Sequence, residues 1–471
     1  MNLLDLAFAP ALEQARLIRR KEVSPLELTE LYLDRIQQLD PKINSYFWVA
    51  ADHAIAEAKA KTESLAGNSE ELPLLFGVPI SIKDLNPVAG MPCTFGVRLL
   101  KKQIATADDG VVRRIRQAGC IILGKTATSE MATLPYTEPD GFPPTRNPWQ
   151  LDYTPGGSSG GAAAALAAGL CAISHGSDGG GSIRGPAFCC GLVGIKPSRG
   201  RVTHAPVGDR LNGIATNGPI GRTVADAAAL LDVMAGYEVG DPYWLPDPDP
   251  SFLAATTQNP GRLKIGLATT IQPAGDADQV CQQAAIDTAR LLETLGHEIE
   301  VVSLDFSNLV EPFRTVYQAI LGDAGWAGIT LLGKVNRWLS LRAQLCSSGK
   351  YLRAVTEMQK EARRIVGLFD SMDVLLSPTY MHPPIRIQEW AKLSPAKTLD
   401  KVIDWIAPCP PFNASGQPAI AIPTGLTPQG LPIGVQLVGR PAAESTLIAL
   451  AAQLEAAQDW GHQRPPLVLA G

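Results

Sequence analysis

The sequence predicts an α/β fold in which a single large mixed β-sheet is covered on both faces by helices. Short β-branched runs alternate with segments of helical periodicity along most of the chain, which is typical of a sheet with helices on its faces. The composition supplies enough apolar material for a large core, because 45% of the 471 residues are hydrophobic and 18% are charged.

The N-terminal part, residues 1–70, is predicted to form helices. Ser24-Pro25-Leu26-Glu27 has the pattern of a capping box with proline at the first helical position, and apolar residues continue at helical spacing as far as Leu39. A Ser/Gly/Glu-rich loop then leads into LLFGVPISIKDL (74–85), a β-branched run that indicates a buried strand.

From residue 108 onward, predicted helices and strands alternate. Helices are predicted over 108–119, 159–169 (ending at Gly169), 278–295 and 443–457, and strands over 120–126, 170–178, 263–269, 297–304, 372–379, 418–426 and 432–440. Residues 240–400 contain irregular stretches rich in proline and tryptophan, which we interpret as a variable region forming part of a pocket. We therefore treat 1–471 as one domain, with 71–235 as its core and 401–471 completing that core.

Charge and composition restrict the classes of partner and cofactor. The formal charge of −5 and the lack of a concentrated Lys/Arg block argue against nucleic acid. The longest apolar run, 162–173, is too short to span a bilayer, and the N-terminus lacks the pattern of a signal peptide. Eight scattered cysteines and six histidines without metal-ligand spacing predict reduced thiols, a cytoplasmic protein and no metal.

Three positions are candidates for catalytic residues. Lys83 ends an apolar strand, where loss of water would lower its pKa and make it a general base, although such a lysine taken alone more often extends to solvent. Ser158 lies in PGGSSGG (155–161), which lacks the Lys and Ser/Thr of a phosphate-binding loop and the spacing of a dinucleotide fingerprint. We interpret that loop as a turn that presents hydroxyls at the start of a helix.

The third position, Ser182, follows three consecutive glycines. The N–H groups of Gly179, Gly180 and Gly181 can converge on a developing oxyanion beside a hydroxyl nucleophile. The alternative is a structural turn in which Ser182 caps the following helix.

Taken together, these segments resemble the amidase signature family over nearly the whole chain. The residues that carry the resemblance include GVPISIKDL (77–85), GKTATSEMA (124–132), PGGSSGGAAAALAAG (155–169), GSDGGGSIRGPA (176–187), GPIGRTVADAAALLDVM (218–234) and NASGQPAIAIPTGLTPQGLPIGVQLVGR (413–440). The resemblance implies the fold of that family, no cofactor, and hydrolysis of an amide through an acyl-enzyme, releasing a carboxylic acid and ammonia or an amine.

The family pattern also implies a Ser–cis-Ser–Lys triad. Ser182 would be the nucleophile, Ser158 the bridging serine after a cis peptide bond, and Lys83 the base. Ser159, Asp178 and Arg184 would brace this arrangement, although Arg184 could equally form a plain structural ion pair. His175 is a rival base, which we expect instead to pack within the sheet.

Two departures from the family pattern bear on the substrate. Gly179 stands where the family usually has Thr, and Ala162 where it usually has Ser. Gly179 is similar to members that cleave nylon-oligomer cyclic dimers, aryl amides or urethanes, which favours a hydrophobic or aromatic amide. We expect a pocket near Met131 and along 310–350 and 380–410, where apolar surface could come from Trp326, Trp338, Trp390, Trp405 and Phe412.

Two other functions remain open at this point. A glutamine-hydrolysing A subunit of a tRNA-dependent amidotransferase would share the triad, but it normally has a serine-rich stretch where this chain has NGIATNGPIGRT (212–223). A catalytically silent scaffold would keep the fold alone. As a hydrolase, the chain is expected to act as a monomer or homodimer on a small-molecule amide.

Overall fold

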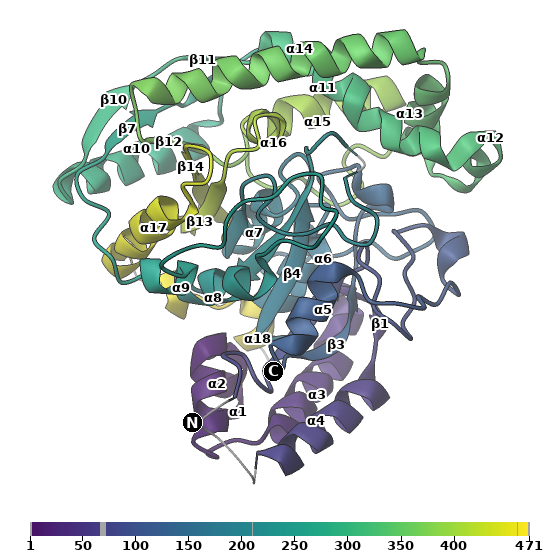
Figure 1. Ribbon diagram of the computed structural model, residues 1–471, viewed down its shortest axis with the longest axis vertical. Coiled ribbons are helices and arrows are strands. Elements are labelled where there is room, and N and C mark those ends of the chain that lie inside the picture. The colour runs from purple at the N-terminus through teal and green to yellow at the C-terminus, as the bar shows by residue number, and fades with distance from the viewer. Residues whose placement is uncertain (1, 66–71, 210, 459, 470–471) are drawn as a thin grey trace.

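One mixed sheet of eleven strands runs through the middle of the molecule (Figure 1). The computed structural model describes residues 2–65, 72–209, 211–458 and 460–469. From edge to edge the strands are β1 (Tyr46–Val49), β3 (Ile121–Thr126), β2 (Pro79–Lys83), β4 (Ile173–Asp178), β6 (Thr216–Gly221), β5 (Val193–Lys196), β13 (Ala419–Leu426), β14 (Pro432–Gly439), β12 (Val374–Pro378), β7 (Lys264–Leu267) and β10 (Glu298–Val301). A small second sheet contains β8 (Thr270–Gln272), β9 (Gly275–Asp276) and β11 (Leu304–Asp305).

Strand directions explain how the sheet brings distant segments together. Strand β2 lies parallel to both of its neighbours, β3 and β4, while β4 pairs antiparallel with β6. The C-terminal strand β13 then pairs antiparallel with β5 in the centre of the sheet. Helices flank this sheet, so the predicted fold class is confirmed.

Helices from the N-terminal part gather at one end of the molecule (Figure 1). They are α1 (Leu3–Phe8), α2 (Ala11–Arg19), α3 (Pro25–Ile43) and α4 (Ala51–Ser64). The predicted capping box is present at the start of α3, where the Ser24 side chain accepts from the Glu27 N–H and the Glu27 carboxylate accepts from the Ser24 N–H.

Further helices lie along the rest of the chain. They are α5 (Gly110–Gln117), α6 (Gly160–Ala167), α7 (Arg184–Cys190), α8 (Val224–Met234), α9 (Phe252–Ala255), α10 (Gln279–Thr294), α17 (Glu444–Gln458) and α18 (Pro466–Leu469). Every residue of α6 is buried, because its glycines and alanines leave room for close packing against the sheet.

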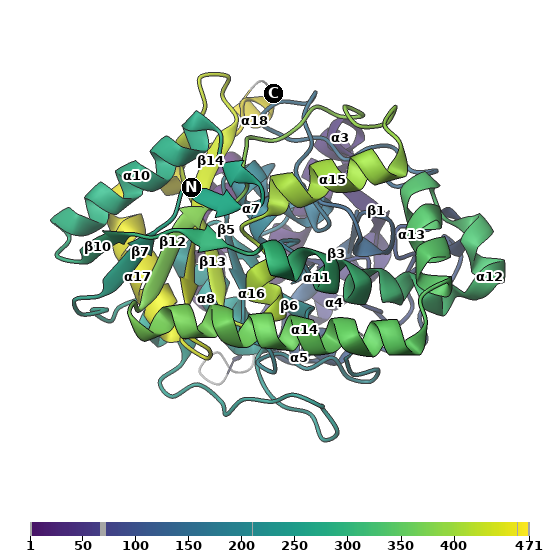
Figure 2. The ribbon, with the colours of Figure 1, turned by 90° about the horizontal axis from the view of Figure 1, so that it is seen from above.

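The variable region forms a helical layer at the end opposite the N-terminal helices (Figures 1 and 2). This layer contains α11 (Ser307–Gln318), α12 (Gly325–Gly328), α13 (Lys334–Gln344) and α14 (Ser348–Gly367), followed by α15 (Pro395–Ile406), which continues past residue 400, and by α16 (Pro410–Ala414), which lies beyond that region. Short 3₁₀ helices occur at Arg98–Leu100, Glu130–Ala132, Ala319–Ala324, Ile329–Leu331, Leu368–Asp370 and Trp460–His462. Much of 240–400 is therefore helical, although prolines and tryptophans made its sequence pattern irregular.

Several strand boundaries differ from the sequence prediction. The run 74–85 contributes only Pro79–Lys83, because Gly77, at a φ of +77°, turns the chain before the strand begins. The run 297–304 divides between β10 and β11. Strands β5 and β6 were not predicted from the sequence. For β6 the reason is that Gly218 and Pro219 within TNGPIG are residues typical of turns.

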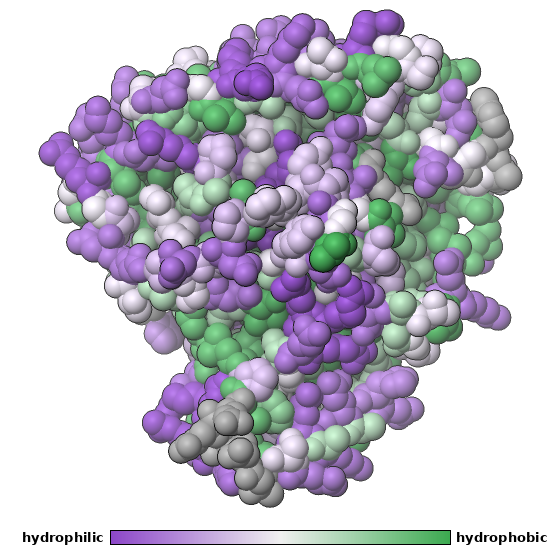
Figure 3. All heavy atoms as spheres, in the orientation of Figure 1, coloured by the Kyte–Doolittle hydropathy of each residue, from purple (hydrophilic) through white to green (hydrophobic). Residues whose placement is uncertain are grey.

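None of the described helices has both the length and the apolar character that crossing a bilayer requires. Figure 3 shows that hydrophilic residues cover much of one face of the molecule, with hydrophobic residues in smaller groups among them.

Candidate active site

Lys83 lies at the end of β2 with its ammonium group fully buried. Its Nζ donates to Ser158 Oγ at 2.7 Å and to Ser177 Oγ at 2.9 Å. The adjacent carboxylate of Asp84 pairs with Lys125 at 2.9 Å instead. Burial lowers the pKa of Lys83 well below its usual value, against an opposing effect of the Asp178 charge. A lysine in this environment can be neutral and accept a proton near neutral pH.

Ser158 is held between Lys83 and the start of α6 by a loop in close contact with other backbone. The Gly157–Ser158 peptide bond is cis, as the family resemblance implies. A Cβ atom at Gly157 would lie 2.5 Å from the Tyr136 nitrogen, and one at Gly161 would lie 2.4 Å from the Ala127 nitrogen. The glycines in PGGSSGG therefore allow the backbone to approach its neighbours closely.

Ser182 follows β4, just before α7, and is 7% exposed. It lines a cavity together with Gly180. Within the described part of the chain, the N–H groups of Gly179, Gly180 and Ser182 have no hydrogen-bond acceptor. The Gly181 N–H differs, since it donates to Asp178 Oδ1 at 2.7 Å and is not available to a ligand.

A buried ion pair holds the ends of the loop that carries Ser182. Arg184 donates from Nε and Nη2 to the two carboxylate oxygens of Asp178, both at 3.0 Å, and neither side chain is exposed. Burial raises the pKa of Asp178, but the Arg184 charge and hydrogen bonds outweigh it and hold that pKa below its usual value. Ser159 Oγ accepts from the Ser177 N–H and donates to the Ser177 carbonyl, joining the two serine-bearing loops.

Three residues of this arrangement were missed by sequence reasoning. Ser177 places a second hydroxyl beside Lys83, and its signal was its position within GSDGGGS on the strand next to β2. Asn413 donates to Asp178 Oδ1 at 2.9 Å and accepts from Arg184 at 2.6 Å. Gln436 accepts from Arg184 at 3.1 Å. Asn413 and Gln436 lie within the motif 413–440, but they are more than 200 residues from Arg184, so no local pattern could have paired them with it.

His175 lies on β4 and is fully buried. Neither ring nitrogen has a hydrogen-bond partner among the residues that the structure describes. Burial, followed by the nearby charge of Lys83, lowers the pKa of His175 to about 3. The ring is therefore neutral at ordinary pH.

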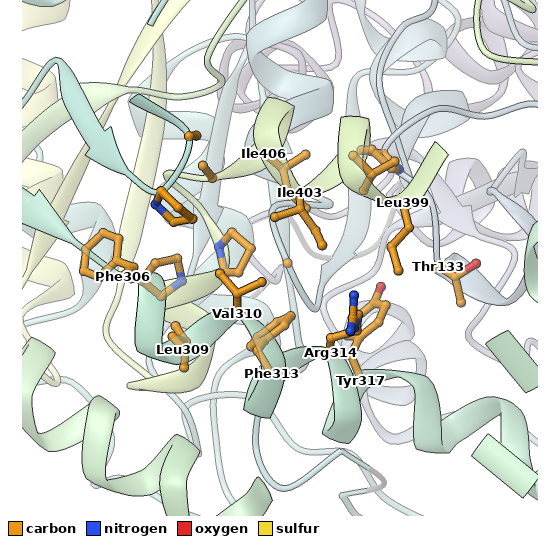
Figure 4. Close-up of a pocket in the computed structure, with 18 of the residues that line it drawn as sticks. Thr133, Phe306, Leu309, Val310, Phe313, Arg314, Tyr317, Leu399, Ile403 and Ile406 are labelled. Carbon is orange, nitrogen blue, oxygen red and sulfur yellow. The ribbon is translucent and has the colours of Figure 1, made fainter. Parts of the chain in front are cut away.

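The cavity above Ser182 has a volume of about 110 Å³ and largely apolar walls (Figure 4). Helix α11 contributes Leu309, Val310, Phe313, Arg314, Tyr317 and Gln318, and α15 contributes Leu399, Val402, Ile403 and Ile406.

The aromatic candidates for the pocket lie elsewhere. Trp405 and Phe412 are buried in the core, and Trp390 lines a neighbouring cavity. Trp338 packs against a small separate hydrophobic cluster, while the Trp326 side chain lies outside the described part of the structure. Met131 packs against the same cluster as Trp338, and its neighbours Thr133 and Leu134 line the cavity above Ser182.

Within the described ranges, no three His, Cys, Asp or Glu side chains gather in a way that could hold a metal ion.

Comparisons with known proteins identify the family to which the chain belongs. The Amidase family matches residues 27–448. A putative amidase from Synechocystis sp. is 51% identical over 456 residues, covering 96% of this chain and 89% of the relative. The structure of a 6-aminohexanoate cyclic dimer hydrolase has a TM-score of 0.91 and 32% identity, covering 98% of this chain and 99% of that one. The structure of a bacterial aryl acylamidase has a TM-score of 0.88 and 28% identity, covering 96% of this chain and 97% of that one. The chain therefore belongs to the amidase signature family of amide-hydrolysing enzymes.

Proposed function

We propose that the chain hydrolyses an amide through an acyl-enzyme on Ser182, with Ser158 and Lys83 as the proton relay. The observation that carries this proposal is the fully buried Lys83 Nζ, 2.7 Å from Ser158 Oγ, beside a cavity that Ser182 lines. Family membership supports it, because the three residues occupy the positions that the family motif assigns to its triad.

The first half of the reaction forms the acyl-enzyme. Neutral Lys83 takes the proton of Ser158 as Ser158 takes that of Ser182, and Ser182 Oγ attacks the amide carbonyl carbon. The tetrahedral intermediate then breaks its C–N bond. The departing nitrogen receives the proton back through Ser158, so ammonia or an amine leaves and an ester remains on Ser182.

The second half hydrolyses that ester. A water molecule passes a proton through Ser158 to Lys83 and attacks the ester carbonyl. The bond between the acyl carbon and Ser182 Oγ then breaks, Ser182 Oγ takes the proton back from Lys83 through Ser158, and the carboxylic acid leaves. The N–H groups of Gly179, Gly180 and Ser182 would stabilise the oxyanion in both halves, because none of them has another acceptor among the described residues. Gly181 has no part in this proposal, because its N–H is bound to Asp178.

The proposed substrate is a small-molecule amide with an apolar or aromatic body. The walls that Phe313, Ile403 and Ile406 contribute favour such a body, since apolar surface leaves water on binding. The likeness to a 6-aminohexanoate cyclic dimer hydrolase and to an aryl acylamidase points in the same direction. No cofactor has a step in this mechanism, and we expect a monomer or homodimer.

The proposal is tested by labelling with a fluorophosphonate probe and by assaying ammonia release from simple amides. Wild type should be labelled and active, whereas Ser182→Ala should be neither. Ser371→Ala removes an exposed serine far along the chain and serves as the matched control that keeps both properties. Equal labelling of wild type and Ser182→Ala would contradict the proposal and favour a silent scaffold.

The assay also separates a free hydrolase from an amidotransferase subunit. The purified chain alone should cleave simple amides. Activity that appears only with partner subunits and charged tRNA would instead assign the chain to the amidotransferase reaction.

A further inference from the structure

The cavity above Ser182 has one charged side chain on its walls, Arg314 of α11. Among the described residues that line the cavity, Arg314 is the only Asp, Glu, Lys, Arg or His. Its side chain is 23% exposed, which places the guanidinium at the rim. In the view of Figure 4, the guanidinium nitrogens extend from α11 toward Leu399 of α15. Arg314 therefore gives the cavity a positive charge that no other lining residue balances.

Most of the N–H donors of Arg314 are unused. Nε and Nη1 have no hydrogen-bond acceptor in the described part of the structure. Neither nitrogen is enclosed by protein atoms, unlike the Nε atoms of Arg222 and Arg342. A guanidinium carries five N–H donors in a planar fork that matches the geometry of a carboxylate. A ligand at the rim can therefore reach donors that the protein leaves free.

The partner that Arg314 does have lies outside the cavity. Nη2 donates to Glu311, three residues earlier on the helix, whose side chain is 64% exposed. Glu311 does not line the cavity. Because exposed ion pairs contribute little, Glu311 is only a weak competitor for an anion that binds inside the rim.

Arg314 lies near the proposed reaction centre. The preceding residue, Phe313, comes within 3.9 Å of the point where a Cβ atom at Gly180 would stand. Tyr317, three residues further on, comes within 3.5 Å of the corresponding point at Gly179. The Cα of Arg314 lies about 1.5 Å beyond that of Phe313 along the helix axis. A substrate whose scissile carbonyl is held by these glycines can therefore place its far end at the guanidinium.

We propose that Arg314 binds a carboxylate at the end of the substrate that is remote from the scissile amide. The carboxylate oxygens accept from the free N–H groups of the guanidinium. The preferred substrates are then ω-amic acids, which carry an amide at one end, a carboxylate at the other and an apolar spacer between them. This inference rests on the proposed function and names its substrate class.

The same walls disfavour a positively charged substrate. No Asp or Glu lines the cavity among the described residues, so an ammonium group there would meet Arg314 without a counterion. Glutamine carries an ammonium group beside its carboxylate, whereas glutaramate has the same chain without that group. Glutaramate should therefore be the better substrate, and a glutamine-hydrolysing subunit would show the opposite order.

The test compares ω-amic acids that contain two to six methylenes with amides of equal length that end in an isopropyl group. The isopropyl group has the shape of a carboxylate without its charge, and ammonia release reports cleavage in both series. Wild type should favour the ω-amic acid by about 10-fold in kcat/KM at the best spacer length. That factor is at the lower end for a hydrogen bond to a charged group, because Arg314 is partly exposed. Added salt should reduce the preference.

Substitutions at the rim should change this ratio according to charge. Arg314→Met should reduce it to within about 3-fold of unity, whereas Arg314→Lys, which keeps the charge, should retain part of it. Arg314→Glu should instead favour amides that end in an ammonium group. Glu311→Gln removes the competing carboxylate and should raise the ratio about 2-fold. A purely structural role for Arg314 would not produce this order.

Arg353→Met is the matched control. Arg353 is exposed on α14, which packs against α11, and it does not line the cavity. The variant loses the same charge from the same layer and should leave the substrate ratio unchanged. A ratio near unity in wild type, or one that survives Arg314→Met, would overturn the proposal. So would a preference for glutamine over glutaramate.

Binding without turnover separates this inference from the proposed function. In Ser182→Ala, calorimetry should show about 10-fold tighter binding of the best ω-amic acid than of its isopropyl counterpart, and adding Arg314→Met should remove that difference. If the difference is present while wild type releases no ammonia, the carboxylate site stands and the hydrolase proposal fails. If wild type hydrolyses both series equally and Ser182→Ala binds them equally, the hydrolase stands and the carboxylate site fails.

Discussion

At the scale of single residues, the proposed mechanism depends on the protonation state of Lys83. Its Nζ contacts two serine hydroxyls and no carboxylate pairs with it in the described part of the chain. Burial destabilises the charged ammonium relative to its state in water, and this is the largest influence lowering the pKa of Lys83. In the proposed relay, Lys83 would therefore be available as a base well below the usual pKa of lysine.

The pH dependence of hydrolysis should report this group. Because Lys83 must be neutral to accept a proton, kcat/KM should fall on the acid side as the pH drops through its lowered pKa. As the pH rises, kcat/KM should reach its plateau at pH values well below 10.5, the usual pKa of a lysine. A pH–rate profile measures this, and residual activity of Lys83→Ala should lack the acid limb. An acid limb that Lys83→Ala retains would contradict the assignment.

His175 leads to a separate prediction about stability. Its pKa is about 3 in the folded protein and about 6.5 when unfolded, so the unfolded chain binds the extra proton between these values. Stability should therefore fall as the pH drops below about 6.5, by up to about 2 kcal/mol between pH 7 and pH 5. Urea unfolding at both pH values should show that His175→Leu lacks this loss.

His53→Leu is the control for that measurement, because His53 is exposed on α4. It should keep the wild-type loss of stability at pH 5. If His175→Leu lost as much stability as wild type on acidification, another group would be responsible.

At the scale of elements, the connection from β4 to α7 depends on the Asp178–Arg184 pair. Asp178 accepts from the backbone N–H groups of Gly181 and Ile183, so its carboxylate sets the course of the loop that carries Ser182. Arg184 in turn contacts residues from two later elements. The ion pair thus links the loop that carries Ser182 to the C-terminal part of the chain.

Removing one partner of this pair should cost more than removing both charges. Arg184→Met leaves the Asp178 carboxylate buried without its counterion and should lower the free energy of unfolding by about 3–5 kcal/mol. The double variant Asp178→Asn/Arg184→Met should recover part of that loss, since no buried charge is left alone. A double-mutant cycle by urea unfolding measures the coupling. Strictly additive losses would show that the two side chains act independently.

Helices α11 and α15 show a different use of secondary structure. Leu309, Phe313 and Tyr317 recur every four residues along α11 and face the cavity, while Thr315 is buried away from it. In most helices this periodicity places the apolar face against a core. In α11 the apolar face lines the cavity instead. The walls of this cavity are therefore built on regular helices.

At the scale of the whole molecule, the C-terminal segment completes the core. Strand β13 pairs with β5, matching Ile420 with Ile195, and α7 packs on β13 and β14. The single-domain organisation remains a prediction, but this pairing gives it a physical basis, because β5 would otherwise expose an unpaired edge.

A fragment containing only residues 1–235 should therefore not fold by itself. It keeps Lys83, Ser158 and Ser182 but lacks β13, β14 and the partners of Arg184. We expect no native near-ultraviolet circular dichroism and no fluorophosphonate labelling, and recovery of both when residues 236–471 are added. A fragment that unfolds cooperatively and is labelled by itself would contradict the single-domain prediction.

Local patterns were sufficient to predict the α/β class, the capping box at Ser24, and the motifs that contain Lys83, Ser158 and Ser182. These features depend on neighbours in sequence, where periodicity and glycine content have direct structural consequences. Strand β6 escaped prediction because its Gly218 and Pro219 are stabilised by pairing with β4, which local propensity does not describe.

By itself the sequence determined which hydroxyl and amine groups were available for chemistry and the class of fold that holds them. Only the tertiary structure decided that Ser177 joins Lys83, that Asn413 and Gln436 support Arg184, and that α11 and α15 rather than the tryptophans form the cavity walls. The physical reason is that these contacts join segments far apart in the chain. Their energies depend on sheet register and on packing between layers, neither of which is encoded within a short stretch of residues.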